Sequence, residues 1–136
     1  MSVLPALDLA LLTVGPLRLG DPPERARLLG APKRSSGSKG NEVHEYEGFE
    51  LEFSGGGLVC VSFDLDEKAS VPVGDWRLSR ATKPVDVQVW LGEPSSDSTG
   101  GQGLRWIDYD RGGATLALEF DAKGLTCVQL YREGYA

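Results

Sequence analysis

The sequence is poor in the residues that most catalytic and metal sites require. Its 136 residues include one histidine, His44, and two cysteines, Cys60 and Cys127. The cysteines form no Cys-x-x-Cys pair and no cluster with the histidine, so no zinc-binding pattern is present. A Ser-His-Asp or Cys-His arrangement would have to use His44, which strand alternation places on the core side. The sequence therefore predicts a protein that is not an enzyme, with no cofactor and no metal site.

Basic residues and long apolar runs are also scarce. The net charge is −6 and the pI is about 4.8, so nucleic acid and anionic membranes are poor electrostatic partners. The first twenty residues lack the basic start and the cleavage site of a signal peptide, and no apolar run approaches the length of a membrane span. These absences predict a cytoplasmic protein with reduced thiols. The acidity has a second interpretation, which is solubility alone.

What the sequence does contain is one pattern that occurs twice. Each copy carries, in the same order, a Leu-Gly-x-Pro, a Leu-Glu-Phe and a Gly-Leu-x-Cys-Val. The first copy has them at 29–32, 51–53 and 57–61, and the second at 91–94, 118–120 and 124–128. A repeat of this kind predicts two structural units that pack side by side.

Each copy is expected to begin with a short helix and a loop. Asp21 is a capping residue before Pro22, and the first helix would end at Gly30. The second helix, about 84–91, would be capped by Thr82 and would carry an apolar face of Val85, Val89 and Trp90. The polar stretches after them, 33–41 and 95–103, read as mobile loops. Residues 3–12 read as a short helix or an edge strand.

Three strands follow each loop, at about 43–47, 49–54 and 58–65, and at about 104–109, 115–120 and 125–131. The fold class predicted is α+β, with two tandem helix-loop-three-strand repeats forming one antiparallel sheet and short helices packed on one face. The chain would be a single domain, 1–136, with repeat 1 at about 17–66 and repeat 2 at about 71–131.

Strand alternation assigns the side chains to two faces of this sheet. The face toward the helices would hold His44, Tyr46, Phe49, Leu51, Phe53, Val59, Val61 and Phe63 and their matches in the second copy, among them Thr126. The opposite face would hold Leu58, Cys60, Leu125 and Cys127. It would also carry Trp106 and five carboxylates, which are Glu45, Glu50, Glu52, Asp108 and Glu119. With no second layer to cover it, this face would be open.

Two interpretations of the open face remain. An antiparallel sheet often has one wet face, with Glu for solubility and Trp106 beneath a loop. An aromatic anchor surrounded by charge is also how protein interfaces commonly look. The cysteines are either half-buried packing residues or, if their strands adjoin, a redox pair. Glu50 and Glu52 resemble paired catalytic carboxylates, but no sugar cleft is indicated.

The doubled pattern resembles the repeat of the β-lactamase-inhibitory-protein fold. The resemblance covers about residues 17–131 and is carried by Leu29-Gly30 and Pro32, by Leu91-Gly92 and Pro94, and by Gly57-Leu58 and Gly124-Leu125. Single-copy relatives of that fold include small lipoproteins that assist outer-membrane protein assembly. Similar small acidic domains occur among immunity proteins of bacterial toxin systems. The resemblance implies a protein inhibitor or an immunity protein.

The functional hypothesis is therefore a non-enzymatic protein-binding module, a bacterial immunity or inhibitor protein that occludes its partner through the open acidic and aromatic face. Trp106 would be the anchor, and the five carboxylates would contact a basic toxin or enzyme. The alternative is a structural or assembly accessory domain of a larger complex or a homodimer. Neither hypothesis involves nucleic acid or a membrane.

Overall fold

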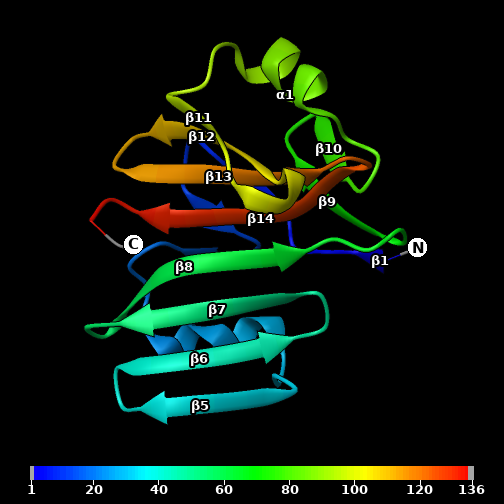
Figure 1. Ribbon diagram of the computed structural model, residues 1–136. Helices are drawn as coiled ribbons and strands as arrows, with labels where there is room; N and C mark the ends of the chain where they lie inside the picture. Colours follow the sequence, from blue (N-terminus) through cyan, green and yellow to red (C-terminus); the bar gives the residue numbers. More distant parts are fainter. Residues whose placement is uncertain (1, 135–136) are drawn as a thin grey trace.

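The computed structural model describes residues 2–134 and shows a chain built mostly of strands in two sheets (Figure 1). The large sheet is antiparallel, with strand order β11-β12-β13-β14-β8-β7-β6-β5. Its first half contains β5 (Arg34–Ser38), β6 (Asn41–Tyr46), β7 (Phe49–Ser54) and β8 (Gly57–Asp64). Its second half contains β11 (Ser96–Thr99), β12 (Arg105–Arg111), β13 (Ala114–Asp121) and β14 (Gly124–Arg132). The two halves meet where β8 pairs with β14.

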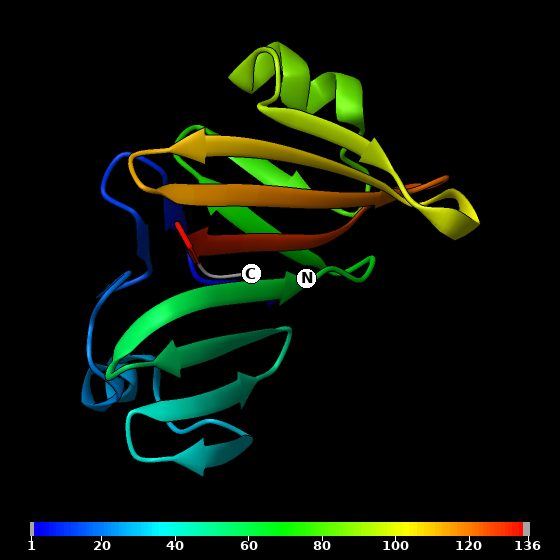
Figure 2. The ribbon, with the colours of Figure 1, turned by 60° about the vertical axis from the view of Figure 1, so that its left-hand side comes forward.

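The small sheet is mixed and has the order β1-β9-β2-β3-β4, with β10 on the other side of β9. Four of its strands have two residues each: β1 (Ser2–Val3), β2 (Leu7–Asp8), β3 (Thr13–Val14) and β4 (Leu17–Arg18). The others are β9 (Ala69–Val73) and β10 (Trp76–Ser79). Figure 2 shows the small sheet against one side of the large sheet.

The predicted fold class is wrong. The chain is not two helix-loop-strand repeats with helices covering one sheet, because a second sheet occupies most of the position expected for the helices. The core lies between the sheets, where Leu7, Leu17 and Val71 of the small sheet pack with Leu51, Phe63, Ile107 and Leu118 of the large one. The hairpins before each helix, β3–β4 and β9–β10, build this layer and were not recognised as part of the repeat.

Both segments expected to be mobile loops contain edge strands of the large sheet. β5 pairs with β6, and β11 pairs with β12, while every residue of β5 and β11 is exposed. Backbone hydrogen bonds hold such strands in place without apolar side chains. Their sequences therefore show no alternation of apolar and polar residues from which a strand could be predicted. A short 3-10 helix, η2 (Gly101–Gly103), follows β11.

The first helix is a 3-10 helix, η1 (Pro23–Leu29), which lies behind β6 and β7 in Figure 1. Asp21 does not cap it as expected. The Asp21 carboxylate instead accepts hydrogen bonds from the Arg18 amide (2.9 Å) and the Arg25 Nε (3.1 Å). The segment before the helix is therefore fixed as a turn, and the helix begins after Pro22.

The second helix, α1 (Pro84–Leu91), has a different buried face from the one predicted. Val87 is buried, whereas Val85 and Val89 are 62% and 76% exposed. Thr82 is not the cap either, because its Oγ1 accepts the Ser79 amide (3.0 Å) and the Asp86 carboxylate accepts the Lys83 amide (2.9 Å). Trp90 lies at the flank of the helix and stacks on Trp76 of β10, with ring centroids 5.3 Å apart.

The predicted faces of several residues in β8 and β14 are wrong, because each half of the sheet contains a bulge. The register shifts between Glu52 and Phe53 and between Glu119 and Phe120. As a result Leu58 and Leu125 turn into the core instead of the open face. Thr126 turns outward and donates its hydroxyl to the Glu119 carboxylate at 2.7 Å. Val59 is fully buried but lies outside the core cluster, since a bulge changes the direction of the side chains that follow it.

Candidate functional site

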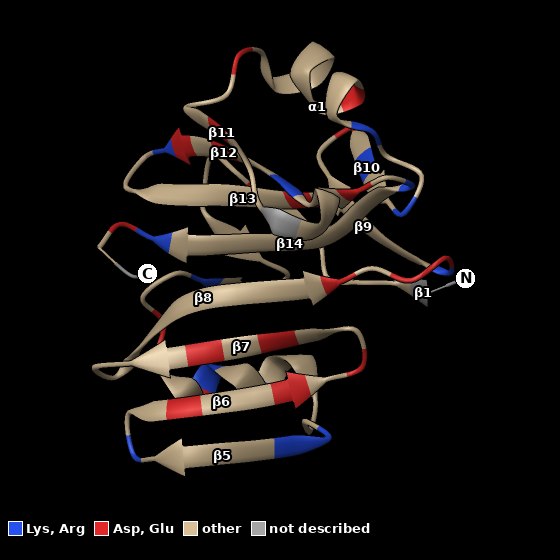
Figure 3. Ribbon diagram, in the orientation of Figure 1, with Lys and Arg blue, Asp and Glu red and all other residues tan. Residues whose placement is uncertain are grey.

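The face of the large sheet that points away from the small sheet is called the open face here. All six predicted contact residues lie on it. They are joined by Cys60, Ser62, Asp64, Cys127, Gln129 and Tyr131 from β8 and β14. Figure 3 shows carboxylate residues along β6 and β7 of this face, and Figure 2 shows the β11–β12 hairpin projecting beside it. The open face therefore combines charged, polar and aromatic side chains from both halves of the chain on one surface.

Three predicted carboxylates form a compact set on β6 and β7, the acidic group. Glu45 lies directly opposite Glu50 in the sheet register, and Glu52 is two residues further along β7. Like charges directly opposite each other in a sheet repel and lower stability. Arg34 on the edge strand reaches Glu45 at 3.6 Å, but its side chain is 76% exposed. A pair that is so exposed offsets little of the repulsion.

The pKa of Glu50 reflects its burial and this repulsion. Partial burial raises the pKa of Glu50, and the negative charges of Glu45, Glu52 and Asp64 raise it further. Each cause disfavours the charged carboxylate, and a positive charge placed nearby would reverse that effect. The acidic group is therefore electrostatically suited to a cationic ligand.

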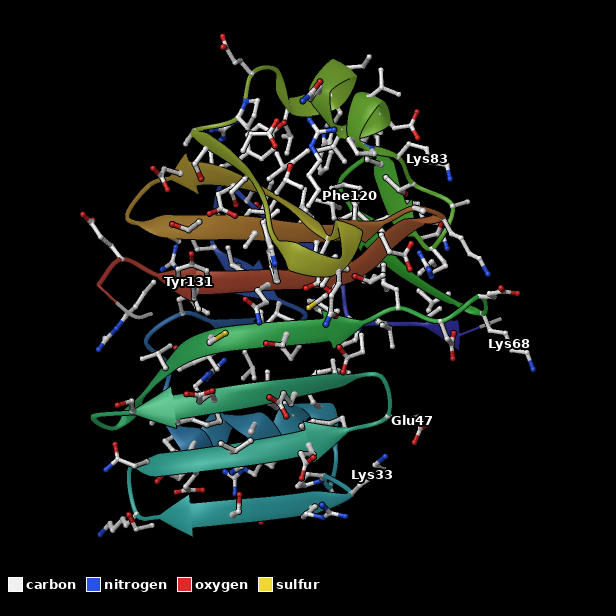
Figure 4. The ribbon with its side chains drawn as sticks, in the orientation of Figure 1. Lys33, Glu47, Lys68, Lys83, Phe120 and Tyr131 are labelled. Atoms are coloured by element: carbon white, nitrogen blue, oxygen red, sulfur yellow. The ribbon has the colours of Figure 1, made fainter. Side chains whose placement is uncertain are left out.

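A pocket of about 340 Å³ lies at the end of the acidic group, where β6 turns into β7 and β8 ends. Four acidic residues line it, Glu45, Glu50, Asp64 and Asp66, together with Phe49. The ring of Phe49 is held by stacking on Tyr46, with centroids 4.7 Å apart. The one cation in its lining, Lys33, pairs with Glu47 at 3.3 Å (Figure 4). This acidic pocket has the size and charge to receive a basic side chain.

The other predicted contact residues form the Trp106 group on β12 and β13. Trp106 lies opposite Glu119, and Asp108 lies opposite Ala117. Ser96 donates its hydroxyl to one oxygen of Asp108 at 3.2 Å, while the other oxygen is buried and has no partner among the described residues. Burial is the main cause that raises the pKa of Asp108. Trp106 itself is half-buried.

The structure does not place all five carboxylates around Trp106. Strands β8 and β14 separate β7 from β13, which puts the two groups about 14 Å apart at the usual strand spacing. Sequence alternation identified the face correctly but not the distances across it. Asp64 and Tyr131 were missed as members of the face, although continuing the alternation by two residues beyond Ser62 and Gln129 would have found them.

His44 is largely buried. Its side chain is 12% exposed, its Nε2 contacts the Glu42 carboxylate at 2.9 Å, and its ring packs 5.1 Å from that of Phe53. This agrees with the packed histidine expected from the sequence. Within residues 2–134, no three His, Cys, Asp or Glu side chains are arranged so that they could hold a metal ion.

The two cysteines lie on adjoining strands but are not placed to form a disulfide. Cys60 is opposite Tyr131, and Cys127 is opposite Asp64, so the cysteines are four residues apart along the strands, or about 13 Å. A disulfide needs Cα atoms within about 7 Å. Burial raises the pKa of Cys60 to about 11 and that of Cys127 to about 12. Both are free thiols of low reactivity.

Comparison with known proteins adds information on the fold alone. No protein-family model matches the chain, and no curated protein is similar to it. The crystal structure of a DUF4309 family protein (YjgB) from Bacillus subtilis subsp. subtilis str. 168 is similar, with a TM-score of 0.54 and 17% sequence identity. The match covers 82% of this chain and 78% of that chain. Separately, no described helix has the length and apolarity needed to span a membrane.

Proposed function

We propose that this chain is a non-enzymatic protein-binding module, and most concretely a bacterial immunity or inhibitor protein that covers a basic region of a toxin or enzyme. The observation that carries the proposal is the direct opposition of Glu45 and Glu50 on the open face, next to Glu52. A row of carboxylates kept for solubility alone could be spread over the surface without mutual repulsion. Their concentration is useful where a positively charged partner binds.

The acidic pocket gives the proposed interaction a specific contact. A Lys or Arg side chain entering it would meet the carboxylates of Glu45, Glu50 and Asp64. Hydrogen bonds between charged groups are roughly twice as strong as those between neutral ones. Binding would also relieve the repulsion that raises the pKa of Glu50. The pocket therefore acts as the primary contact, ahead of Trp106.

The Trp106 group supplies the second contact of the same interface. It lies about 14 Å from the acidic group, a separation that an ordinary protein interface spans easily. The half-buried ring of Trp106 offers apolar area, and Asp108 and Glu119 extend the negative charge. The net charge of −6 would speed association with a basic protein. A cytoplasmic location, with both thiols reduced, is part of this proposal.

A direct test compares two double variants in binding a penta-lysine peptide and the protein encoded by the adjacent gene. Glu50→Gln with Glu52→Gln removes two charges from the acidic group. The control, Glu24→Gln with Asp75→Asn, removes two charges from exposed positions elsewhere. Net charge is therefore equal in the two variants. Titration calorimetry at low and at physiological salt measures the affinities.

We expect the Glu50/Glu52 variant to bind at least about tenfold more weakly than the control, since losing one charged hydrogen bond costs about 1.5–3 kcal/mol. Trp106→Ala is expected to weaken binding of the encoded protein but not of the peptide. Equal affinities of the two double variants would show that only net charge matters and would reject the open face as the interface. If the encoded protein is an enzyme, its inhibition should follow the same order.

The alternative function, an accessory domain acting as a homodimer, has one observation in its favour. Val85 and Val89 on α1 and Trp76 on β10 are exposed apolar side chains. A second copy of the chain could cover them. Analytical ultracentrifugation of the natural chain and of Val89→Asp tests it, because a dimer that uses α1 should dissociate in the variant. A natural chain that stays monomeric at about 100 µM removes this alternative.

A further inference from the structure

A second pocket lies on the small sheet, on the face that points away from the core. Val71, Val73 and Leu78 turn inward from β9 and β10, so the alternate residues Ser70, Arg77 and Ser79 face outward. The pocket has a volume of about 520 Å³ and extends to the turn between β13 and β14. This size is within the range of small-molecule sites. It belongs neither to the open face nor to the acidic pocket.

The charge of this pocket is opposite to that of the molecule. Three cationic side chains line it, from Arg77, Arg80 and Lys123, against one carboxylate, Glu67. The chain as a whole has 14 basic and 20 acidic residues. Figure 3 shows basic residues at β10 and at the β13–β14 turn, on the side of the molecule where these elements meet. We call this region the basic pocket.

Two of the three cations are held in place by the fold. Arg77 Nη1 donates to Ser70 Oγ at 3.1 Å, and Ser70 is 2% exposed. Arg80 donates to the Leu125 carbonyl at 3.3 Å and pairs with the Asp121 carboxylate. A guanidinium has five N–H donors, so each arginine keeps donors for a ligand. Because both guanidinium groups already make hydrogen bonds to the fold, a ligand would lose less free energy in fixing them than in fixing free side chains.

The third cation stands on a rigid turn with a free ammonium group. The Asp121 carboxylate accepts the amides of Lys123 (2.8 Å) and Gly124 (3.1 Å), and Lys83 Nζ donates to the Lys123 carbonyl. No described group forms a salt bridge or hydrogen bond with Lys123 Nζ. The backbone of this turn is thus fixed, while its charge remains available at the mouth of the pocket.

We propose that the basic pocket binds the anionic group, carboxylate or phosphate, of a small organic molecule. Arg77 and Lys123 would contact the oxygens directly, since a guanidinium fork matches either group and an ammonium adds charge. Arg80, already paired with Asp121, forms part of the wall of the pocket. The methyl group of Ala81 would contact the apolar part of the molecule. This site is independent of the proposed protein-binding function.

The test is an NMR titration of the full chain with four probes: inorganic phosphate, phenyl phosphate, benzoate and, as the neutral control, benzyl alcohol. Arg77→Gln and Lys123→Gln each remove one proposed contact. Lys33→Gln and Arg34→Gln are matched controls, because they remove cations at the far edge of the large sheet. Amide spectra without ligand show whether each variant is folded. Lys123 is exposed, so its variant tests the site even if Arg77→Gln does not fold.

We expect saturable shifts at Ala69, Ser79 and Lys123 with phenyl phosphate or benzoate, with a Kd of about 1 mM or below. Affinity should fall about tenfold in Arg77→Gln and Lys123→Gln and stay unchanged in both controls. Binding of inorganic phosphate alone supports the anionic contact and assigns no role to Ala81. Shifts that do not saturate, equal losses in the controls, or equal binding of benzyl alcohol would each overturn the proposal.

Discussion

Tyr46 and Tyr109 occupy the same position in the two halves of the large sheet, and each donates its phenolic hydroxyl to the carbonyl of the glycine that follows a helix. Tyr109 reaches Gly92 at 2.9 Å, and Tyr46 reaches Gly30 at 3.3 Å while also contacting the Ala26 carbonyl at 3.3 Å. The doubled sequence thus preserves one contact that ties each helix to its half of the sheet.

This contact predicts different costs for the same substitution. Tyr109→Phe should lower the free energy of unfolding by about 1–2 kcal/mol, because Tyr109 is fully buried and its bond is short. Tyr46→Phe should cost less, about 0.5–1 kcal/mol, because its two hydrogen bonds are longer. Urea unfolding measures both values. A larger loss for Tyr46→Phe would contradict this explanation.

Glu50 should make stability depend on pH. Its pKa is raised from the ordinary 4.5, so around and above that pH the folded state binds more protons than the unfolded state. Stability therefore falls as pH rises through this window, and the loss persists at neutral pH. Glu50→Gln should add about 0.5 kcal/mol at pH 7 and little below about pH 4. Urea unfolding at both pH values tests this, with Glu24→Gln as the control; a gain of equal size at both pH values would refute it.

Gly124 marks a close approach between the β13–β14 turn and the segment before α1. A Cβ added there would lie 2.3 Å from the Arg80 carbonyl oxygen, and the residue has φ of +143°. Gly124→Ala should therefore cost about 3 kcal/mol. The matched Gly57→Ala, whose Cβ would lie 2.9 Å from the Gly20 carbonyl oxygen, should cost about 1–2 kcal/mol.

Gly100 is the control for these two substitutions. Its φ is −86°, and an added Cβ would meet only the Leu104 carbonyl oxygen at 4.0 Å. Gly100→Ala should change the unfolding free energy by less than about 0.5 kcal/mol. Thermal unfolding of the three variants measures their order of stability directly. A Gly124→Ala protein as stable as Gly100→Ala would be incompatible with the described turn.

Cys60 and Cys127 should react slowly in the native protein. With pKa values of about 11 and 12, about a thousandth or less of either thiol is ionised at pH 8. Alkylation by iodoacetamide, followed by mass spectrometry, should be at least about 100-fold slower than in urea. Mild oxidation should form no intramolecular disulfide. Detection of a 60–127 disulfide in the folded protein would contradict the described register of β8 and β14.

The sequence predicted the long strands well because their apolar residues alternate. The expected strand at 49–54 is β7, and those at 115–120 and 125–131 lie within β13 and β14. The small sheet could not be found in this way, because four of its strands have two residues each and show no period. Edge strands β5 and β11 could not be recognised because they contain only Ser, Gly, Thr and charged residues.

For the candidate site, alternation assigned all six residues to the correct face. It could not show that β8 and β14 lie between Glu50 and Glu119, because pairing between distant strands depends on packing across the sheet and leaves no local signal. The basic pocket was missed for a similar reason. Arg77 and Lys123 are 46 positions apart, and only the meeting of β10 with the β13–β14 turn brings them together.

The composition of β5 and β11 has a consequence for how these molecules behave at high concentration. Both outer strands of the large sheet carry Ser, Gly, Thr and charged side chains only, all of them exposed. A neighbouring molecule that joined either rim through its backbone would remove almost no apolar surface from water, so the attachment would gain little free energy. The rims thereby protect a chain made mostly of strands against stacking end to end into fibres.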